Sequence, residues 1–413
     1  MELEVELKKA KQAGRKLVSV SDKDIGAVLF KLSDLLKKNK KEILAANKKD
    51  LLKIDKKLSI YDRILLTEER INELADGLKT IANYASPIGK IIEEKPLKNG
   101  LKLRKISVPL GVVGVIFEAR PNITIDVFAL CFKAKNACVM KGGSDCALSS
   151  EILMKMIKKA LGKKLENAVT LLPNDRSVVA KFMRANNYVD VLIPRGSANL
   201  IKFVRENATI PVIETGAGVV HTYFDETGKV SMAEDIIFNE KNRRPSVCNA
   251  LDTLIIHKSR LDDLKSICKP LISTKVKIFA DKLSYDKLKN SYPKELLALA
   301  KAENFGKEYL SLQMSIKTVN NIQEAIDHIN TYGSMHSEAI ITENKNHAEK
   351  FLKEVDAACV YVNASTTFTD GGEFGLGAEI GISTQKLHAR GPMGINELTS
   401  YKWLVYGKGQ IRK

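Results

Sequence analysis

Short apolar runs alternate with helix-like segments from residue 111 onward, and this alternation leaves few folds open to the chain. The runs expected to form strands span residues 111–117, 137–140, 169–172, 189–193 and 211–213. Residues 124–135 and 146–161, which lie between them, have helical periodicity. Strands joined by helices in this way form parallel sheets. The pattern therefore predicts an α/β fold with a parallel sheet covered by helices on both faces.

A second alternating region follows in the C-terminal half. Its apolar runs span residues 254–256, 276–279, 340–341 and 359–362. A chain of 413 residues exceeds one ordinary hydrophobic core. We therefore expect a second α/β domain, which begins just after Cys248.

The segment before the first sheet has a different character. Residues 2–85 have the apolar spacing of helices, set among many lysines. Pro87, Pro96 and Asn99-Gly100 then interrupt the pattern, and Asn-Gly between apolar runs is a hairpin signal. Residues 90–108 are predicted to form a protruding two-stranded arm.

Polar or glycine-containing segments come directly after strands of the first predicted sheet. They span residues 118–122, 141–144, 194–197 and 214–218. Ligands of open parallel sheets bind beyond the carboxyl ends of the strands. These four segments are therefore the predicted ligand-binding edge.

The composition excludes several classes of protein. Hydrophobic residues make up 44% and charged residues 28%, as in ordinary globular proteins. We find no run of about 20 apolar residues that would cross a bilayer, and the first residues mix Glu with Lys, unlike a secretory signal. We therefore expect no membrane association, reduced thiols and a cytoplasmic location. The spacing of the six cysteines and six histidines predicts no metal site.

The net charge of +17 raises the alternative of a nucleic-acid-binding protein. The lysines are interleaved with acidic residues, as on solvated helix faces, and no nucleic-acid-binding motif accompanies them. We interpret the charge as a lysine-rich surface that also suits anionic substrates, and we predict no nucleic-acid partner.

Cys248 is the candidate nucleophile. It follows Arg243 and Arg244, and nearby cations lower the pKa of a thiol. Glu214, followed by Thr-Gly-Ala-Gly, is a carboxylate that could serve this thiol in acyl-transfer or aldehyde chemistry. The alternative is that Cys248 is one more buried small apolar residue. Its position at the junction of two predicted domains favours a catalytic cleft.

Several longer motifs resemble one enzyme family. They are residues 108–114 (VPLGVVG), 117–122 (FEARPN), 139–144 (VMKGGS), 244–250 (RPSVCNA), 362–366 (VNAST), 375–381 (GLGAEIG) and 388–392 (HARGP). Together they are similar to the gamma-glutamyl phosphate reductases of the aldehyde dehydrogenase superfamily, over nearly the whole chain. The resemblance implies an aldehyde-dehydrogenase-like fold, with a Rossmann-type cofactor domain, an α/β catalytic domain and a β-hairpin oligomerisation arm.

The resemblance also implies domain boundaries. Residues 1–89 and 109–216 would bind NADP, residues 217–385 would form the catalytic domain, and residues 90–108 with 386–413 would form the arm. The arm implies a homo-oligomer.

The implied reaction is NADPH-dependent reduction of L-glutamate 5-phosphate to L-glutamate 5-semialdehyde, with release of phosphate, in proline biosynthesis. Cys248 would form a thioester, and the Asn122 amide with the Cys248 backbone N–H would stabilise the oxyanion. Glu214 either takes the proton of Cys248 or only holds nearby backbone. A functional link to glutamate 5-kinase follows from the same resemblance.

The resemblance assigns binding residues as well. Lys141 would contact the adenosine ribose of NADP(H), and the small Ser144 would leave room for its 2′-phosphate. Gly196 and Ser197, which open a helix, would hold the pyrophosphate. Glu308 would bind the nicotinamide ribose, unless it is an ordinary surface carboxylate.

Arginines are expected to bind the substrate anions, with Arg120 and Arg244 chosen from a pool that includes Arg195, Arg243 and Arg390. A related enzyme that uses another activated acid, such as a CoA thioester, is the remaining enzymatic alternative.

Overall fold

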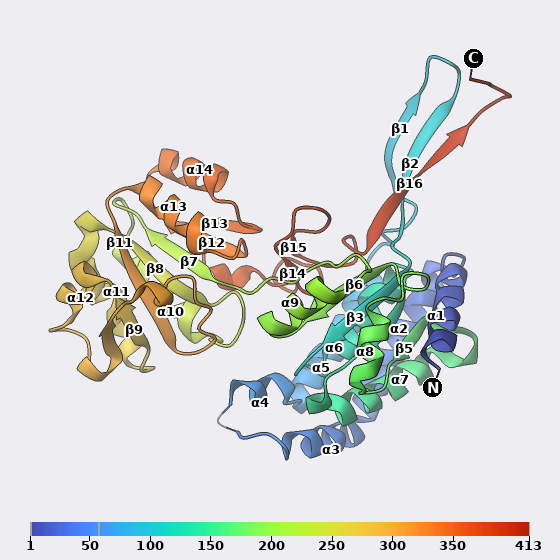
Figure 1. Cartoon of the computed structure of the whole chain (residues 1–413), viewed down its shortest axis with the longest axis horizontal. Coiled ribbons are helices and arrows are strands. Elements are labelled where there is room, and N and C mark those ends of the chain that lie inside the picture. Colours follow the sequence, from blue (N-terminus) through green and yellow to red (C-terminus); the bar gives the residue numbers. More distant parts are fainter. Residues whose placement is uncertain (1, 57, 413) are drawn as a thin grey trace. The chain divides into compact units, whose positions relative to one another are not determined.

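The computed structural model describes residues 2–56 and 58–412, with the side chains of Ser59 and Arg176 left aside. The chain divides into two compact units. Unit 1 consists of Met1–Thr215, Gly375–Gly381 and Leu387–Lys413, and unit 2 consists of Gly216–Phe374 and Ile382–Lys386. Figure 1 colours the chain along its sequence, so that the ends of the chain, blue and red, are seen to belong to unit 1.

Helices begin unit 1, as the spacing of apolar residues predicts. They are α1 (Leu3–Leu17), α2 (Asp22–Lys38), α3 (Lys40–Leu51), α4 (Ser59–Ile64) and α5 (Glu68–Asn83). The side chains of Ser21 and Thr67 cap α2 and α5, each accepting a hydrogen bond from a backbone N–H in the first turn. The apolar face of α2 is fully buried through Ile25, Leu29, Leu32 and Leu36.

The sheet of unit 1 is parallel, in the strand order β5-β4-β3-β6. Its strands are β3 (Val112–Phe117), β4 (Ala137–Lys141), β5 (Val169–Leu171) and β6 (Val191–Arg195), and the helices after them are α6 (Ile123–Lys133), α7 (Ala147–Leu165), α8 (Arg176–Phe182) and α9 (Ala198–Asn207). Val113 and Val115 face the core that contains α2, whereas Val112 and Ile116 face the core that contains α1. Both faces are therefore covered, which confirms the predicted architecture.

The strand expected at residues 211–213 does not form. Val212 makes only an isolated parallel bridge to Leu192. Pro211 has no N–H to donate, and its carbonyl accepts from Leu192 N–H, while Ile213 N–H donates to Leu192 O.

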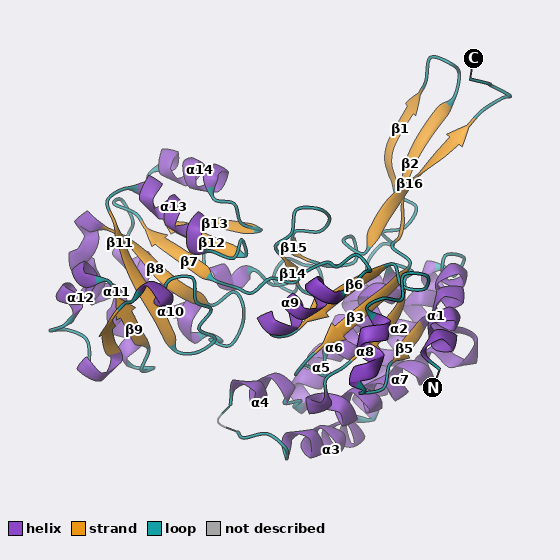
Figure 2. Ribbon diagram, viewed as in Figure 1, coloured by secondary structure: helices purple, strands orange, loops and turns teal. Residues whose placement is uncertain are grey.

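Unit 2 contains a longer parallel sheet, in the order β10-β9-β11-β8-β7-β12-β13. Its strands are β7 (Val220–Phe224), β8 (Leu251–His257), β9 (Lys277–Ala280), β10 (Leu297–Leu299), β11 (Gln313–Val319), β12 (Ser337–Ile341) and β13 (Cys359–Val362). Figure 2 shows helices on both sides of these strands: α10 (Val230–Asn242), α11 (Leu264–Cys268), α12 (Lys282–Leu288), α13 (Ile322–Tyr332) and α14 (Lys345–Glu354). Phe224 and Ile256 face α10 to α12, and Tyr223 and Ile255 face α13 and α14. The second predicted α/β region is confirmed.

Two central strands of this sheet were absent from the sequence prediction. β7 contains His221 and Thr222, and β11 contains Ser315, all of them buried. Such polar residues hide the apolar run by which a buried strand is recognised. Most of their polar atoms have distant partners: the Thr222 hydroxyl donates to Glu240, His221 Nδ1 lies 3.0 Å from Glu338, and the Ser315 hydroxyl donates to Asn304 O.

The predicted hairpin arm is present and gains a strand from the end of the chain. β1 (Ile91–Pro96) pairs antiparallel with β2 (Lys102–Pro109), and β2 pairs antiparallel with β16 (Thr399–Tyr406). Gly100 has a φ of +83°, and Leu97 N–H donates to Leu101 O to close the turn. Figure 1 shows the arm projecting from the sheet of unit 1.

The C-terminal part of the chain also enters the main core of unit 1. Ile380, Met393 and Leu398 are buried in the same apolar cluster as Leu29 and Phe128. Backbone hydrogen bonds hold this segment together, because Ile380 N–H donates to Met393 O and Met393 N–H donates to Gly381 O. In the part of the chain that the structure describes, no helix has both the length and the apolar character needed to span a membrane.

Candidate active site

Cys248 lies in the short loop between the end of α10 and the start of β8, in unit 2. All six cysteines belong to the described residues, and Cys248 alone among them is partly exposed. The others are buried, and burial raises the pKa of the Cys146 and Cys268 thiols to about 12. The interpretation of Cys248 as a fully buried apolar residue is therefore wrong.

Gly218 packs directly against the backbone of Cys248. A Cβ atom added at Gly218 would lie 1.6 Å from Cys248 O and 2.7 Å from its Cα, so no larger residue fits without movement of the loop. The glycine at position 218 is thus required for close packing, and not only for flexibility of the segment after Glu214. It allows the chain that enters β7 to run against the loop that carries the thiol.

Glu308 reaches the same place from the loop before β11. Its Oε1 accepts a hydrogen bond from Gly218 N–H over 2.9 Å. Unit 2 therefore brings together three segments that are far apart in sequence, around Cys248, Gly218 and Glu308. Glu308 is half-buried and holds the backbone beside the thiol, which is more than a surface carboxylate does.

The residue after Cys248 is fixed from a further side. Asn249 is buried, and its side-chain amide donates to the carbonyls of Thr367 and Thr369 over 3.2 and 3.0 Å. Thr366 Oγ1 in turn donates to Asn249 O over 2.9 Å. The motif at residues 362–366 includes Thr366, but the sequence did not indicate that this segment contacts Asn249, more than a hundred residues away.

Lys141 ends β4 in unit 1, and its ammonium donates to Asn174 Oδ1 over 2.9 Å. A cavity of about 240 Å³ lies at the carboxyl ends of β4 and β5. Its walls are Gly142, Gly143, Ala147, Ser150, Glu151, Leu171, Leu172, Pro173 and Asn174. Ser144, which begins the 3-10 turn before α7, follows the glycines of this wall. The carboxyl-end rule thus located a cavity, whereas Asn174 and Glu151 were not foreseen.

Gly196 and Ser197 directly precede α9, and Ser197 Oγ caps the helix by accepting from Leu200 N–H. Glu118, just after β3, already places its carboxylate here, because its Oε2 accepts from both the backbone N–H and the hydroxyl of Ser197 over 3.1 Å. A negative charge at a helix N-terminus is favourable. Glu118 therefore provides an anion at the position where the resemblance assigns the cofactor pyrophosphate.

Asn122 stands at the N-cap position of α6 without a side-chain capping hydrogen bond, and its amide donates to Asp126 Oδ2 over 2.9 Å. One N–H of the amide is used in this way, and the other is left for a further acceptor. Ala119, between Glu118 and Arg120, has a φ of +53°, a conformation that costs energy for a residue with a Cβ. Arg120 is half-buried in unit 1, whereas Arg244 is exposed in unit 2.

Glu214 has a partner in its own unit. Its Oε2 lies 3.3 Å from Arg205 Nη1 on α9, and its side chain retains a fifth of its exposure. Glu214 belongs to unit 1 and Cys248 to unit 2. The hydrogen bond to Arg205 fits the alternative in which Glu214 holds nearby structure.

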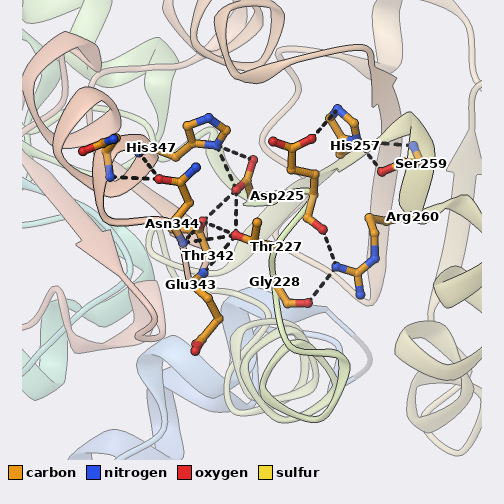
Figure 3. Close-up of polar contacts among 12 residues, drawn as sticks. Asp225, Thr227, Gly228, His257, Ser259, Arg260, Thr342, Glu343, Asn344 and His347 are labelled. Carbon is orange, nitrogen blue, oxygen red and sulfur yellow. Dashed lines mark hydrogen bonds and ion pairs between the residues drawn. The ribbon is translucent and has the colours of Figure 1, made fainter.

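The carboxyl edge of the unit 2 sheet, at the opposite end of β8 from Cys248, carries a polar network (Figure 3). Asp225 is fully buried, accepts from Thr342 Oγ1 over 2.6 Å, and lies 3.0 Å from His347 Nδ1. Thr227 Oγ1 accepts from the backbone N–H groups of Glu343 and Asn344. This network ties the loop after β7 to the loop after β12, which is a structural role. Within residues 2–56 and 58–412, no group of three or more metal-binding side chains is present.

Substituting Asp225 by asparagine is expected to lower the melting temperature, since losing a hydrogen bond to a buried charged group costs about 1–3 kcal/mol. Burial raises the Asp225 pKa, but the hydrogen bonds from Thr342 and His347 outweigh it and hold the pKa below its usual value. A lowered carboxyl pKa gives stability above the unfolded pKa and loses it as the pH falls through the folded one. Thermal unfolding between pH 2 and pH 7 should therefore show a smaller acid-induced loss in Asp225→Asn than in wild type.

Comparison with known proteins agrees with this arrangement. The model of the aldehyde dehydrogenase family matches residues 1–278 and 300–404. The chain is 53% identical to the gamma-glutamyl phosphate reductase of Chlorobium phaeobacteroides over 409 residues, 98% of both chains. It is 54% identical to that of Chlorobaculum parvum over 408 residues, 98% of this chain and 97% of the relative.

A solved structure extends the comparison to three dimensions. The crystal structure of gamma-glutamyl phosphate reductase from Thermotoga maritima superposes with a TM-score of 0.93, at 38% identity and with 100% of each chain covered. The aldehyde-dehydrogenase-like α/β fold is thereby confirmed. The chain belongs to the aldehyde dehydrogenase family and, within it, to the gamma-glutamyl phosphate reductases.

Proposed function

We propose that this protein reduces L-glutamate 5-phosphate to L-glutamate 5-semialdehyde with NADPH and releases phosphate, a step of proline biosynthesis. The observation that carries the proposal is the partly exposed Cys248 in the RPSVCNA loop, which packs against Gly218, itself hydrogen-bonded to Glu308. Relatives named for this activity share more than half of the sequence, which supports the choice of substrate.

The reaction begins with the Cys248 thiolate. Its sulfur attacks the acyl carbon, the carbon–oxygen bond to phosphate breaks, and phosphate leaves with the electron pair. The product is a thioester on Cys248. A bound reduced nicotinamide supplies the hydride that converts this thioester to the aldehyde. Cys248 then leaves as thiolate when the carbon–sulfur bond breaks, and the enzyme is restored.

Oxyanion charge develops when the thiolate attacks, and again when the thioester carbon is reduced. We propose that the Asn122 amide and the Cys248 N–H donate hydrogen bonds to this oxygen. Asp126 accepts one N–H of the Asn122 amide over 2.9 Å and so fixes its orientation. Arg120 and Arg244 are proposed to hold the anionic groups of the substrate, because guanidinium groups form paired hydrogen bonds with phosphate and carboxylate.

Replacing Asn122 with alanine is expected to lower kcat about 100-fold with a smaller change in KM, because losing one oxyanion donor costs about 3 kcal/mol of barrier. Asn122→Leu, with similar size but no amide donor and no charge, should behave in the same way. Steady-state NADPH oxidation, measured over a range of L-glutamate 5-phosphate concentrations up to saturation, gives both constants. A change in KM alone would exclude the proposed role of the amide.

We propose that the adenosine end of NADP(H) binds in the cavity beside Lys141. The cavity offers about 240 Å³ between two glycines and Asn174, enough for one end of a dinucleotide but not the whole. Lys141 supplies the positive charge that a 2′-phosphate requires, next to the small Ser144. Glu118 already satisfies the Ser197 N–H, so Gly196 and Ser197 can hold the pyrophosphate only if that carboxylate moves. The fit to NADP(H) therefore rests mainly on Lys141, and Glu308 is proposed to bind the nicotinamide ribose.

The arm is proposed to join subunits into a homo-oligomer. Its outer strands, β1 and β16, expose Ile92, Tyr401 and Val405, with more than half of each side chain open to solvent. Exposed apolar residues on edge strands invite pairing with another chain. A functional link to a glutamate 5-kinase and a cytoplasmic location complete the proposal.

The deciding experiment compares activated acids. Full-length protein is mixed with NADPH and with either L-glutamate 5-phosphate, generated in place by a kinase, or an acyl-CoA thioester. We expect NADPH oxidation matched one to one by phosphate release with the first substrate and no turnover with the second. Turnover of the thioester alone would favour a CoA-dependent enzyme.

A further inference from the structure

Asp252 is a buried carboxylate that the proposed reaction does not use. It is the second residue of β8, four positions after Cys248, and is 2% exposed. Its Oδ1 accepts from Tyr309 N–H over 2.9 Å, and its Oδ2 accepts from Val220 N–H over 3.3 Å. One carboxylate thus holds two segments that are distant in sequence.

Each of these two segments leads to the loop that carries Cys248: Gly218 packs on that loop, and Glu308 bonds to Gly218. Tyr309 directly follows Glu308, and Val220 comes two residues after Gly218, which packs on Cys248. Gly218 and Glu308 are themselves joined by a hydrogen bond of 2.9 Å. The arrangement closes a ring in which Asp252 fixes the distance between the Glu308 segment and the Cys248 loop.

Lys241, the second-last residue of α10, balances the charge of Asp252. It is fully buried, its ammonium donates to Leu251 O over 2.6 Å, and it lies 6.0 Å from the centre of the Tyr309 ring. Burial raises the Asp252 pKa and lowers the Lys241 pKa, and the attraction between the two groups opposes both shifts. A buried pair of this kind is costly, and an apolar pair of similar volume is often as stable. Stability alone is therefore a weak reason for its presence.

The chemistry of the side chain explains why a carboxylate stands here. Two N–H donors approach the two oxygens of one group, and only a carboxylate offers two acceptors. An amide of the same shape accepts one hydrogen bond and turns an NH₂ group toward the other donor. Asp252→Asn should therefore release either the Glu308 segment or the Gly218 segment.

We infer that Asp252 is a positioning residue, which acts through Glu308 and Gly218 to set the cofactor-binding carboxylate beside Cys248. The inference deepens the proposed function and rests on it. Asp252 touches none of the reacting atoms, so its effect must appear in NADPH binding and in the behaviour of the thiol.

The test separates positioning from stability with paired variants of the full-length protein. Asp252→Asn/Lys241→Met removes both buried charges, so that no unpaired ion remains, and its melting temperature should stay near that of wild type. Its Kd for NADPH, measured by fluorescence titration, should rise about tenfold, the loss of one hydrogen bond to a charged group. Asp225→Asn, a buried carboxylate at the other end of the sheet, is the control: it loses stability and keeps the wild-type Kd.

A double-mutant cycle with Glu308→Gln shows whether Asp252 acts through Glu308. The tenfold effect should disappear when Glu308 is already changed, because the two residues then share one interaction. Independent, additive effects would overturn the inference, as would a wild-type Kd in Asp252→Asn/Lys241→Met.

The alkylation rate of Cys248 by iodoacetamide needs neither substrate nor cofactor, and so distinguishes the two ways to fail. If wild type neither binds NADPH nor turns over, the proposed function is lost. The alkylation rate then still decides whether Asp252 holds the loop. If Asp252 holds the loop, Cys248 in Asp252→Asn/Lys241→Met is alkylated at a rate different from wild type. If Asp252 does not hold the loop, the two rates are equal.

Discussion

Cys248→Ser is expected to reduce turnover at least about 1000-fold. A serine hydroxyl stays protonated at neutral pH and is too weak a nucleophile to attack the acyl phosphate. The substitution changes one atom in a partly exposed loop, so the fold should survive. NADPH oxidation and phosphate release, followed together with L-glutamate 5-phosphate, measure the effect.

Cys268→Ala is the matched control for this experiment. Cys268 is fully buried, and burial raises its pKa to about 12, so it is neither reachable nor ionised. The control should keep turnover near the wild-type value. Iodoacetamide should inactivate wild type and Cys268→Ala at the same rate. Full activity in Cys248→Ser would exclude covalent catalysis at this residue.

Gly218→Ala is expected to lower kcat about 100-fold and to reduce the melting temperature. The added methyl group would lie 1.6 Å from Cys248 O, and the atoms that it meets are backbone, which cannot rotate away as a side chain can. The thiol loop must therefore shift by about an ångström, and misplacement of this size costs on the order of 100-fold in rate.

Gly26→Ala is a matched control, because it makes the same change in a helix of unit 1. A Cβ at Gly26 meets its nearest neighbour, Ala82 O, at 3.6 Å, an ordinary contact. This control should keep full activity and at least wild-type stability, since alanine favours helix more than glycine does. If Gly218→Ala had the kcat and melting temperature of wild type, the close packing around Cys248 would have no catalytic importance.

The sequence predicted the parallel sheets and singled out Cys248 as the candidate nucleophile, because both inferences depend on local patterns. Apolar runs such as Val112–Phe117 identify buried strands by themselves, and the carboxyl-end rule led to Lys141 and its cavity. Cys248 is recognisable from its neighbours in the chain, Arg243 and Arg244. None of these inferences requires a distant contact.

The contacts that arrange the site could not be predicted in the same way. Glu308 and Gly218 meet across 90 positions of sequence, and Asp252 and Tyr309 across 57. The strand β7 was missed for a related reason, since the partners of Thr222 and His221, Glu240 and Glu338, come from other elements. From sequence alone a polar residue is predicted to be exposed, because its buried hydrogen-bond partner is not known.

The division of unit 1 between the two ends of the chain has a consequence for synthesis. Unit 2 is built mainly from one continuous stretch, Gly216–Phe374, and can fold as soon as that stretch is complete. The core of unit 1 instead waits for Ile380, Met393 and Leu398, and β2 waits for β16. The half of the protein made first is therefore the half finished last, and until residues 375–406 have been made its apolar surface is open to chaperones and proteases.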